Sequence, residues 1–297
     1  MNGSAEKKGM GWLPDHPDIR DFTADHDEVK KIKNGKTEQS DPLSINPDPP
    51  QSYDLREWCS PVEDQGPLGS CSAHAGIALV EYFIRKASGR NLDVSRLFMY
   101  KVTRNLSHIE GDSGAQMRTT IGAMTLFGVP PEEYWPYEIT NYDNEPPAFC
   151  YQFAESFRAI NYFRLDPPNT TPEFRLNLIK DYISKGFPSI FGFTAYSCMD
   201  QAKTPTASGM IPFPDISDVA IGGHAVMAVG YDNNIEILNS KSKNTFKGAF
   251  LIRNSWGVEW GIDGYGWLPY EYLTRRLARD WWTVIKQDWV DTGKFGF

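Results

Sequence analysis

Hydrophobic and polar positions divide the chain into a polar beginning, a middle with helical spacing and an end with short apolar runs. The first helical stretch is apolar nearly all round, which is typical of a helix buried on most sides. Gly89 and Gly128 each follow a helical stretch, and glycine commonly ends a helix. The spacing predicts helices over residues 72–86, 116–127 and 171–185.

The second half of the chain carries short apolar runs that predict strands. Helices early and strands late are typical of an α+β fold with two lobes, and a cleft between lobes is a common place for a site. We expect an N-terminal extension over residues 1–50, a helical lobe over 51–165 and a β lobe over 166–297. The predicted strands cover residues 187–193, 224–231, 249–253 and 264–268.

The N-terminal extension is polar and ends in a proline-rich stretch, which favours an extended connector. An apolar island with Trp12, Leu13 and Phe22 interrupts it. Because such side chains are costly to leave in water, we expect the island to dock on the main domain.

Composition excludes several classes of protein. The chain has 297 residues, a formal net charge of -8 and a pI of about 5.2, and no stripe of Lys and Arg, so no nucleic-acid partner is expected. It has no apolar run long enough for a membrane span and no signal peptide, so we expect a cytoplasmic protein or one exported by another route. Four cysteines are too few for a disulfide scaffold in a chain of this length.

Cys71 is the strongest candidate for a nucleophile. It follows a turn-rich loop, residues 64–70, and opens the first predicted helix. The free N–H groups at a helix N-terminus favour a negative charge and lower the pKa of a thiol. On this loop alone, a buried and inert cysteine remains an equal alternative. The inert interpretation is favoured for Cys59, Cys150 and Cys198.

A thiolate needs a base, and the chain has five histidines. His224 begins a predicted strand, which would hold its ring rigidly at a lobe edge. Asn254 would accept a hydrogen bond from one ring nitrogen and leave the other facing the thiol, and Trp256 would cover that bond. Each residue alone is also compatible with a structural role. The remaining histidines lie in the extension, elsewhere on the surface of the Cys71 helix, or in a polar stretch, and they are His16, His26, His74 and His108.

Three motifs together resemble the papain family of cysteine peptidases over residues 53–285, in the expected order. The resemblance implies a papain-like two-lobe fold, with a helical lobe, a β-barrel-like lobe of antiparallel strands, and the active site in the cleft between them. The overall character resembles a bacterial branch with a short extension. The motifs are Gln65-Gly66 with Gly69-Ser70-Cys71, Gly223-His224-Ala225-Val226, and Asn254-Ser255-Trp256-Gly257.

The resemblance implies a role for each matching residue. Cys71 would be the nucleophile, held as a thiolate beside the imidazolium of His224, and Asn254 would orient the ring. Gln65 and the Cys71 backbone N–H would form the oxyanion hole. No cofactor and no metal ion is implied. The substrate-binding residues, which suggest an apolar residue at the second position before the cut, would be Gly114, Ala115, Met117, Gly223, Ala225 and Trp256.

The chain departs from the family pattern without changing these four catalytic residues. Leu68 stands where the family has a cysteine, and no cysteine lies near the expected partner position at residues 111–113, so that disulfide is absent. Ser72 replaces the usual aromatic residue after the nucleophile. The interval between His224 and Asn254 is longer than in most relatives, which predicts an extended hairpin over residues 233–248.

The combined pattern predicts a cysteine endopeptidase that acts on peptides or proteins. We expect residues 1–50 to lie across the cleft as a propeptide or latch, an intramolecular inhibitor that makes the enzyme a zymogen. The alternative is a segment that docks without a regulatory role, or a partly disordered tail. Two other functions use the same fold, an acyl transferase with the same triad and a catalytically silent binding protein. A zinc site is disfavoured because paired Cys or His ligand spacing is missing.

Overall fold

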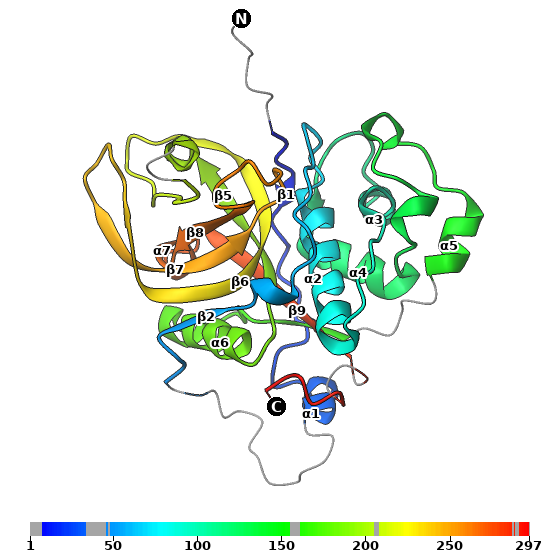
Figure 1. Cartoon of the computed structure of the whole chain (residues 1–297), viewed down its shortest axis with the longest axis horizontal. Helices are drawn as coiled ribbons and strands as arrows, with labels where there is room; N and C mark the ends of the chain where they lie inside the picture. The colour runs from blue at the N-terminus through cyan, green and yellow to red at the C-terminus, as the bar shows by residue number, and fades with distance from the viewer. Residues whose placement is uncertain are drawn as a thin grey trace, which may run out of the picture.

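The computed structural model describes residues 8–33, 46, 48–154, 161–204, 208–286, 288 and 291–296. Most helices gather in one half and the large sheet forms the other, so the predicted α+β class is confirmed (Figure 1). The helices are α1 (Asp27–Lys33), α2 (Cys71–Ser88), α3 (Arg96–Leu106), α4 (Met117–Phe127), α5 (Ala148–Ala154), α6 (Pro172–Ser184) and α7 (Glu271–Thr274). The strands are β1 (Trp12–Leu13), β2 (Ser52–Asp54), β3 (Ala115–Gln116), β4 (Asn161–Arg164), β5 (Ser189–Tyr196), β6 (Ala220–Leu238), β7 (Thr245–Arg253), β8 (Tyr265–Pro269) and β9 (Ala278–Ile285).

The central helix α2 is buried almost throughout, as its continuous apolar sequence predicts. It ends at Gly89, which adopts φ 74° and donates its N–H to the carbonyl of Arg85. The helices predicted over 116–127 and 171–185 are confirmed as α4 and α6. Thr171 caps α6 by accepting a hydrogen bond from the N–H of Phe174 at 3.1 Å. Among the described helices, none combines the length and apolar character that crossing a membrane requires.

The large sheet has seven strands in the order β4-β9-β5-β6-β7-β8, with β2 paired to β6. All of its pairs are antiparallel, as expected. The sheet is open rather than closed into a barrel, because β4 and β8 at its two ends do not pair with each other in the described part of the chain. The extended hairpin is confirmed, since β6 continues to Leu238 and β7 begins at Thr245.

Two elements that matter for the site were not expected from the sequence. Helix α3 packs beside α2 in the helical half, although its mixed charged and apolar sequence gave no clear signal. Strand β9 occupies an inner position in the sheet and pairs with β4. Residues 161–164 therefore belong to the sheet, and the division between lobes near residue 165 stays a prediction.

The N-terminal segment, defined here as residues 8–23, runs between the helical half and the sheet (Figure 1, dark blue). Strand β1 pairs in parallel with β3, matching Trp12 with Ala115. Trp12 is only 4% exposed and Phe22 packs against the core, so the predicted docking of the apolar island is confirmed. Residues 1–7, 34–45 and 47 of the extension lie outside the described residues.

Candidate active site

Cys71 is the first residue of α2 and is fully buried. Its sulfur accepts a hydrogen bond from the backbone N–H of Gly11 at 3.3 Å. The backbone N–H of Ala225, the residue that follows His224, also lies in hydrogen-bonding contact with this sulfur. The fold therefore brings the helix N-terminus of one half against strand β6 of the other.

His224, on β6, meets Asn254, the residue that follows the neighbouring strand β7. The ring nitrogen Nε2 of His224 lies 2.7 Å from Oδ1 of Asn254. The Trp256 indole stacks on the imidazole, with ring centroids 4.5 Å apart and planes inclined by 28°. Nδ1 of His224 is buried and has no hydrogen-bond partner among the described residues. Because Asn254 engages Nε2, Nδ1 is the nitrogen left for proton transfer.

Gln65 is fully buried beside Cys71, and its amide is held at both ends. Ser255 donates its hydroxyl to Oε1 of Gln65 at 2.5 Å. Nε2 of Gln65 donates to the carbonyl oxygens of Leu68 at 2.7 Å and Gly9 at 3.1 Å. The side-chain donor expected for an oxyanion therefore already binds a carbonyl of the N-terminal segment.

Backbone groups of the N-terminal segment form hydrogen bonds with the residues around the site. Gly9 donates its N–H to the carbonyl of Gly66 at 2.9 Å, and Gly11 accepts the N–H of Ala115 at 2.7 Å. A Cβ on Gly114 would lie 2.0 Å from the carbonyl oxygen of Gly11, and Gly114 has φ 78°. This close approach requires glycine at position 114.

The Trp12 side chain fills a pocket next to the nucleophile, on the surface of β5 and β6. A Cβ on Gly192 would lie 2.0 Å from the Trp12 ring, and one on Gly223 would lie 2.2 Å from the Trp12 carbonyl oxygen. The guanidinium of Arg279 lies 5.9 Å from the ring centroid. Met117, expected to line this pocket, is fully buried at the start of α4.

Burial controls the protonation of Cys71 and His224. It raises the pKa of the Cys71 thiol to about 11, although the N–H of Gly11 opposes the shift. It lowers the pKa of His224 to about 4, against the opposing hydrogen bond to Asn254. Near neutral pH both groups are therefore uncharged in this structure. Burial therefore disfavours the expected thiolate and imidazolium in this structure.

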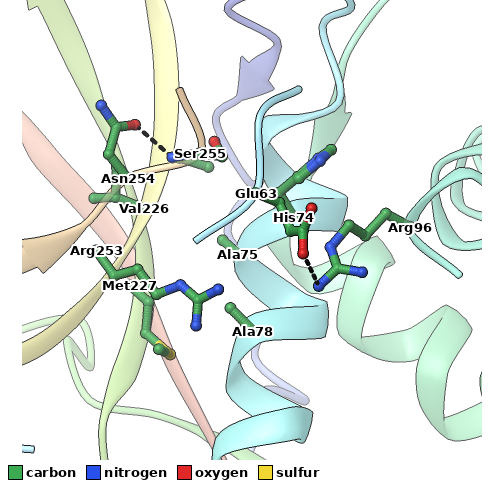
Figure 2. Close-up of a pocket in the computed structure, with 11 residues that line it drawn as sticks. Glu63, His74, Ala75, Ala78, Arg96, Val226, Met227, Arg253, Asn254 and Ser255 are labelled. Carbon is green, nitrogen blue, oxygen red and sulfur yellow. Dashed lines mark hydrogen bonds and ion pairs between the residues drawn. The ribbon is translucent and has the colours of Figure 1, made fainter. Parts of the chain in front are cut away.

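A small polar cavity of about 10 Å³ lies between the two halves (Figure 2). Arg253 extends into it from the sheet side and Arg96 from the helical side. Arg253 donates to Oγ of Ser60 at 2.9 Å, and Ser60 donates to Glu81 on α2 at 2.5 Å. Arg96 pairs with the same carboxylate at 3.0 Å. This buried chain connects the helix that carries Cys71 to the strand that precedes Asn254.

Three further features of the described residues bear on the site. His74 is buried rather than on the surface; its Nδ1 lies 3.1 Å from the carbonyl of Ser70, and burial lowers its pKa to about 3. The four cysteines are free and buried, so no disulfide joins Cys59, Cys150 or Cys198. Among the described residues, no group of His, Cys, Asp and Glu is arranged to hold a metal ion.

Four residues that contribute to the site were not predicted from the sequence. Ser255 lies between two residues that the motif singled out, yet its contact with Gln65 depends on the fold. Gly192 gave no signal, because only the pairing of β5 with β6 puts it beneath Trp12. The glycines at 9 and 11 flank the apolar island, and this pattern could have indicated a close backbone approach.

The fold and the site define a two-lobed thiol hydrolase with a cysteine at a helix N-terminus and a histidine on the facing sheet. A sequence model described as "Papain family cysteine protease" matches residues 49–274, and the chain belongs to this papain family and is a cysteine peptidase. An uncharacterized peptidase C1-like protein of Acanthamoeba polyphaga mimivirus is 35% identical over 295 residues, covering 96% of this chain and 89% of that protein.

A solved structure and a further relative agree with this assignment. The crystal structure of xylellain, a cysteine protease from Xylella fastidiosa, is similar with a TM-score of 0.74 and 31% identity, covering 95% of this chain and 97% of that one. Procathepsin L of Mus musculus is 26% identical over 278 residues, covering 89% of this chain and 75% of the relative. The similarity to a bacterial enzyme is compatible with the predicted bacterial branch, which stays a prediction.

Proposed function

We propose that the chain is a cysteine endopeptidase that is latent while its N-terminal segment lies in the cleft. Cys71 is the nucleophile, His224 the general acid and base, and Asn254 the residue that orients the imidazole. The observation that carries the proposal is the contact of the Cys71 sulfur with the backbone beside His224, whose Nε2 is engaged by Asn254 at 2.7 Å. This arrangement leaves Nδ1 of His224 for the thiol proton.

In the proposed reaction, Nδ1 of His224 takes the thiol proton and the sulfur attacks the scissile carbonyl carbon. Gln65 and the Cys71 backbone N–H donate to the oxyanion that forms. The carbon–nitrogen bond then breaks as His224 returns the proton to the leaving amine, which gives a thioester. Water, deprotonated by His224, releases the acyl group and regenerates the thiol.

The latent state is supported by the groups that the N-terminal segment engages. The N–H of Gly11 binds the nucleophilic sulfur and the carbonyl of Gly9 binds the Gln65 amide, so both reactive positions are taken. Burial of Cys71 and His224 favours their neutral forms, although the N–H of Gly11 by itself opposes the shift at Cys71. Displacement of the segment would rehydrate Cys71 and His224 and allow the charged pair to form.

The pocket occupied by Trp12 supports an apolar residue at the second position before the cut. Gly192 and Gly223 leave room there for a large ring, and Ala115 offers backbone pairing beside it. A groove also continues past Trp256 on the other side of the nucleophile, along Met10 and Ile221. Space on both sides of Cys71 favours cutting within a chain over trimming its ends.

Hydrolysis of a fluorogenic peptide under reducing conditions tests the proposal. The peptide carries an apolar residue at the second position, and the proteins are the full chain and a chain lacking residues 1–50, each with and without Cys71→Ala. We expect turnover that increases on truncation and vanishes in Cys71→Ala. Gln65→Ala in the truncated chain should lower kcat by about 100-fold or more.

Each alternative function predicts a different result in this assay. An acyl transferase would give a coupled product when an amine acceptor is added, in place of most hydrolysis. A silent binding protein would show no turnover in any folded form, with folding checked by circular dichroism. Loss of folding on truncation, with no gain in activity, would make the extension a structural element rather than an inhibitor.

A further inference from the structure

The far end of the N-terminal segment docks on a cluster of buried charges outside the catalytic site. On the body of the protein, the cluster contains two guanidinium groups, Arg118 and Arg164, and two carboxylates, Asp166 and Asp280. Docking adds Asp15 and Asp21. Asp21 pairs with Arg164 at 2.9 Å and with Arg118 at 2.5 Å. Within these four groups the charges balance, so Asp15 and Asp21 bring two further negative charges to the cluster.

Asp15 is the carboxylate without a close cation. Its side chain is completely buried, and the nearest guanidinium nitrogen, on Arg164, lies 4.0 Å away. Its direct donors are uncharged N–H groups, the Trp282 indole at 2.9 Å and the Arg118 backbone at 3.2 Å. Asp280 lies against it and accepts the Asp15 backbone N–H at 2.8 Å. Two carboxylates this close, in a buried place, favour a protonated form of one of them.

The other charged groups around Asp15 do not reverse this balance. Arg164 is shared among Asp21, Asp166 and Asp280. The remaining charged groups that face this part of the segment are His16, Asp18, Arg175, Arg276 and Arg279. Among the described residues, none of these groups forms an ion pair with Asp15, and Asp18 is paired with Arg20 at 2.6 Å.

We propose that docking of the N-terminal segment takes up a proton at Asp15, so that the latch is tighter in mildly acidic solution and loosens as the pH rises towards neutral. This inference rests on the proposed latch and adds its regulation. The geometry that carries it is a fully buried Asp15 next to Asp280, without a cation of its own. Asp21 provides the ionic anchor, and Asp15 provides the pH dependence.

The direction of this pH dependence follows from the change in the pKa of Asp15 when the segment docks. Burial, followed by the charge of Asp280, raises the pKa of Asp15 from 3.8 to about 7. Burial also raises the pKa of Asp166 in the same cluster, to about 6. A carboxyl whose pKa is higher in the docked state stabilises docking at low pH, and that contribution is lost as the pH rises through the docked pKa. From pH 5 to 8, docking should therefore weaken by on the order of 50- to 100-fold.

The accessibility of Cys71 in the full chain tests the inference. The probe is 2,2′-dipyridyl disulfide, which forms a mixed disulfide with a thiol and releases pyridinethione over this pH range; Cys71→Ala supplies the background from the other cysteines. The rate is measured from pH 5 to 8 for wild type and for Asp15→Asn, and their ratio removes the pH dependence of the thiol itself. We expect this ratio to rise by on the order of 50-fold over that range. Asp18→Asn is a matched change on the same segment. The ratio of the wild-type labelling rate to that of Asp18→Asn should not change with pH.

A second measurement does not depend on any variant folding. Hydrogen–deuterium exchange of residues 8–23 in the wild-type chain, corrected for the intrinsic effect of pH, should show weaker protection at pH 7.5 than at pH 5. A flat or falling reactivity ratio, with equal or greater protection at pH 7.5, overturns the inference. Rapid labelling of wild-type Cys71 at every pH would instead contradict the latch, while absent peptide turnover contradicts the peptidase and leaves both docking measurements valid.

Discussion

At the scale of single residues, the site consists of donors and acceptors that the fold has already oriented. Nε2 of His224 is taken up by Asn254 and covered by Trp256, which leaves one nitrogen for chemistry. Gln65 is fixed by Ser255 at Oε1, which turns its N–H groups towards the cleft. An amide that is held in place loses little orientational freedom when the oxyanion forms, and this is the physical advantage of a buried, satisfied side chain.

Ser255→Ala tests this positioning role in the chain without residues 1–50. The change removes a hydrogen bond to Gln65 and leaves every proposed catalytic group in place, so we expect kcat to fall by about 5- to 10-fold with little change in KM. Ser240→Ala, an exposed serine in the turn between β6 and β7, is the matched control and should behave as wild type. A loss as large as that of Gln65→Ala would mean that Ser255 does more than orient the amide.

At the scale of elements, the N-terminal segment is held at two separate places. Trp12 fills the pocket over Gly192, and the carboxylates of Asp15 and Asp21 reach the charged cluster beyond it. Gly9 and Gly11 contact Gln65 and Cys71 at one end of this run, so the groups proposed to block the site differ from those that anchor the segment. Anchoring by side chains and blocking by backbone can therefore be tested separately.

Trp12→Ala should release the segment without touching the nucleophile. Removal of a buried tryptophan costs about 3–5 kcal/mol, so labelling of Cys71 in the full chain should accelerate by on the order of 100-fold or more. Ile19→Ala is the control, because Ile19 belongs to the same segment but is completely exposed. Unchanged labelling in Trp12→Ala would show that the backbone contacts alone hold the segment.

At the scale of the whole molecule, the catalytic geometry depends on how two halves are fixed to each other. Cys71 belongs to α2 in the helical half. His224 belongs to strand β6 of the sheet, and Asn254 is the residue that follows β7. The chain of contacts through Arg96, Glu81, Ser60 and Arg253 links the two halves, and Figure 2 shows its two arginines extending from opposite sides. Because these groups are buried, removing one leaves its partners without compensation.

Glu81→Ala should therefore destabilise the protein strongly. The change leaves Arg96 and Ser60 without a shared buried partner, and breaking such a pair typically costs about 3–5 kcal/mol of the free energy of unfolding. Urea unfolding followed by tryptophan fluorescence measures this quantity. Glu133→Ala, at an exposed glutamate, should change it by less than about 0.5 kcal/mol. Similar stability of the two variants would contradict a linking role for Glu81.

The sequence by itself determined the helices α2, α4 and α6, the strands β5 to β8 and the motif residues Gln65, Cys71, His224 and Asn254. These depend on local spacing, on caps such as Gly89 and Thr171, and on short motifs whose order along the chain is informative. The docking of Trp12 also followed from the cost of leaving its ring in water.

Only the tertiary structure decided what depends on contacts between distant segments. The neutral state of the Cys71 and His224 pair arises because residues 9–11 close over it, and burial then outweighs the helix N-terminus that favours a thiolate. The inner position of β9, the open sheet and the charge imbalance around Asp15 likewise come from pairings between remote parts of the chain. Local pattern cannot specify such pairings, because the free energy of a buried charge depends on every group that the fold brings beside it.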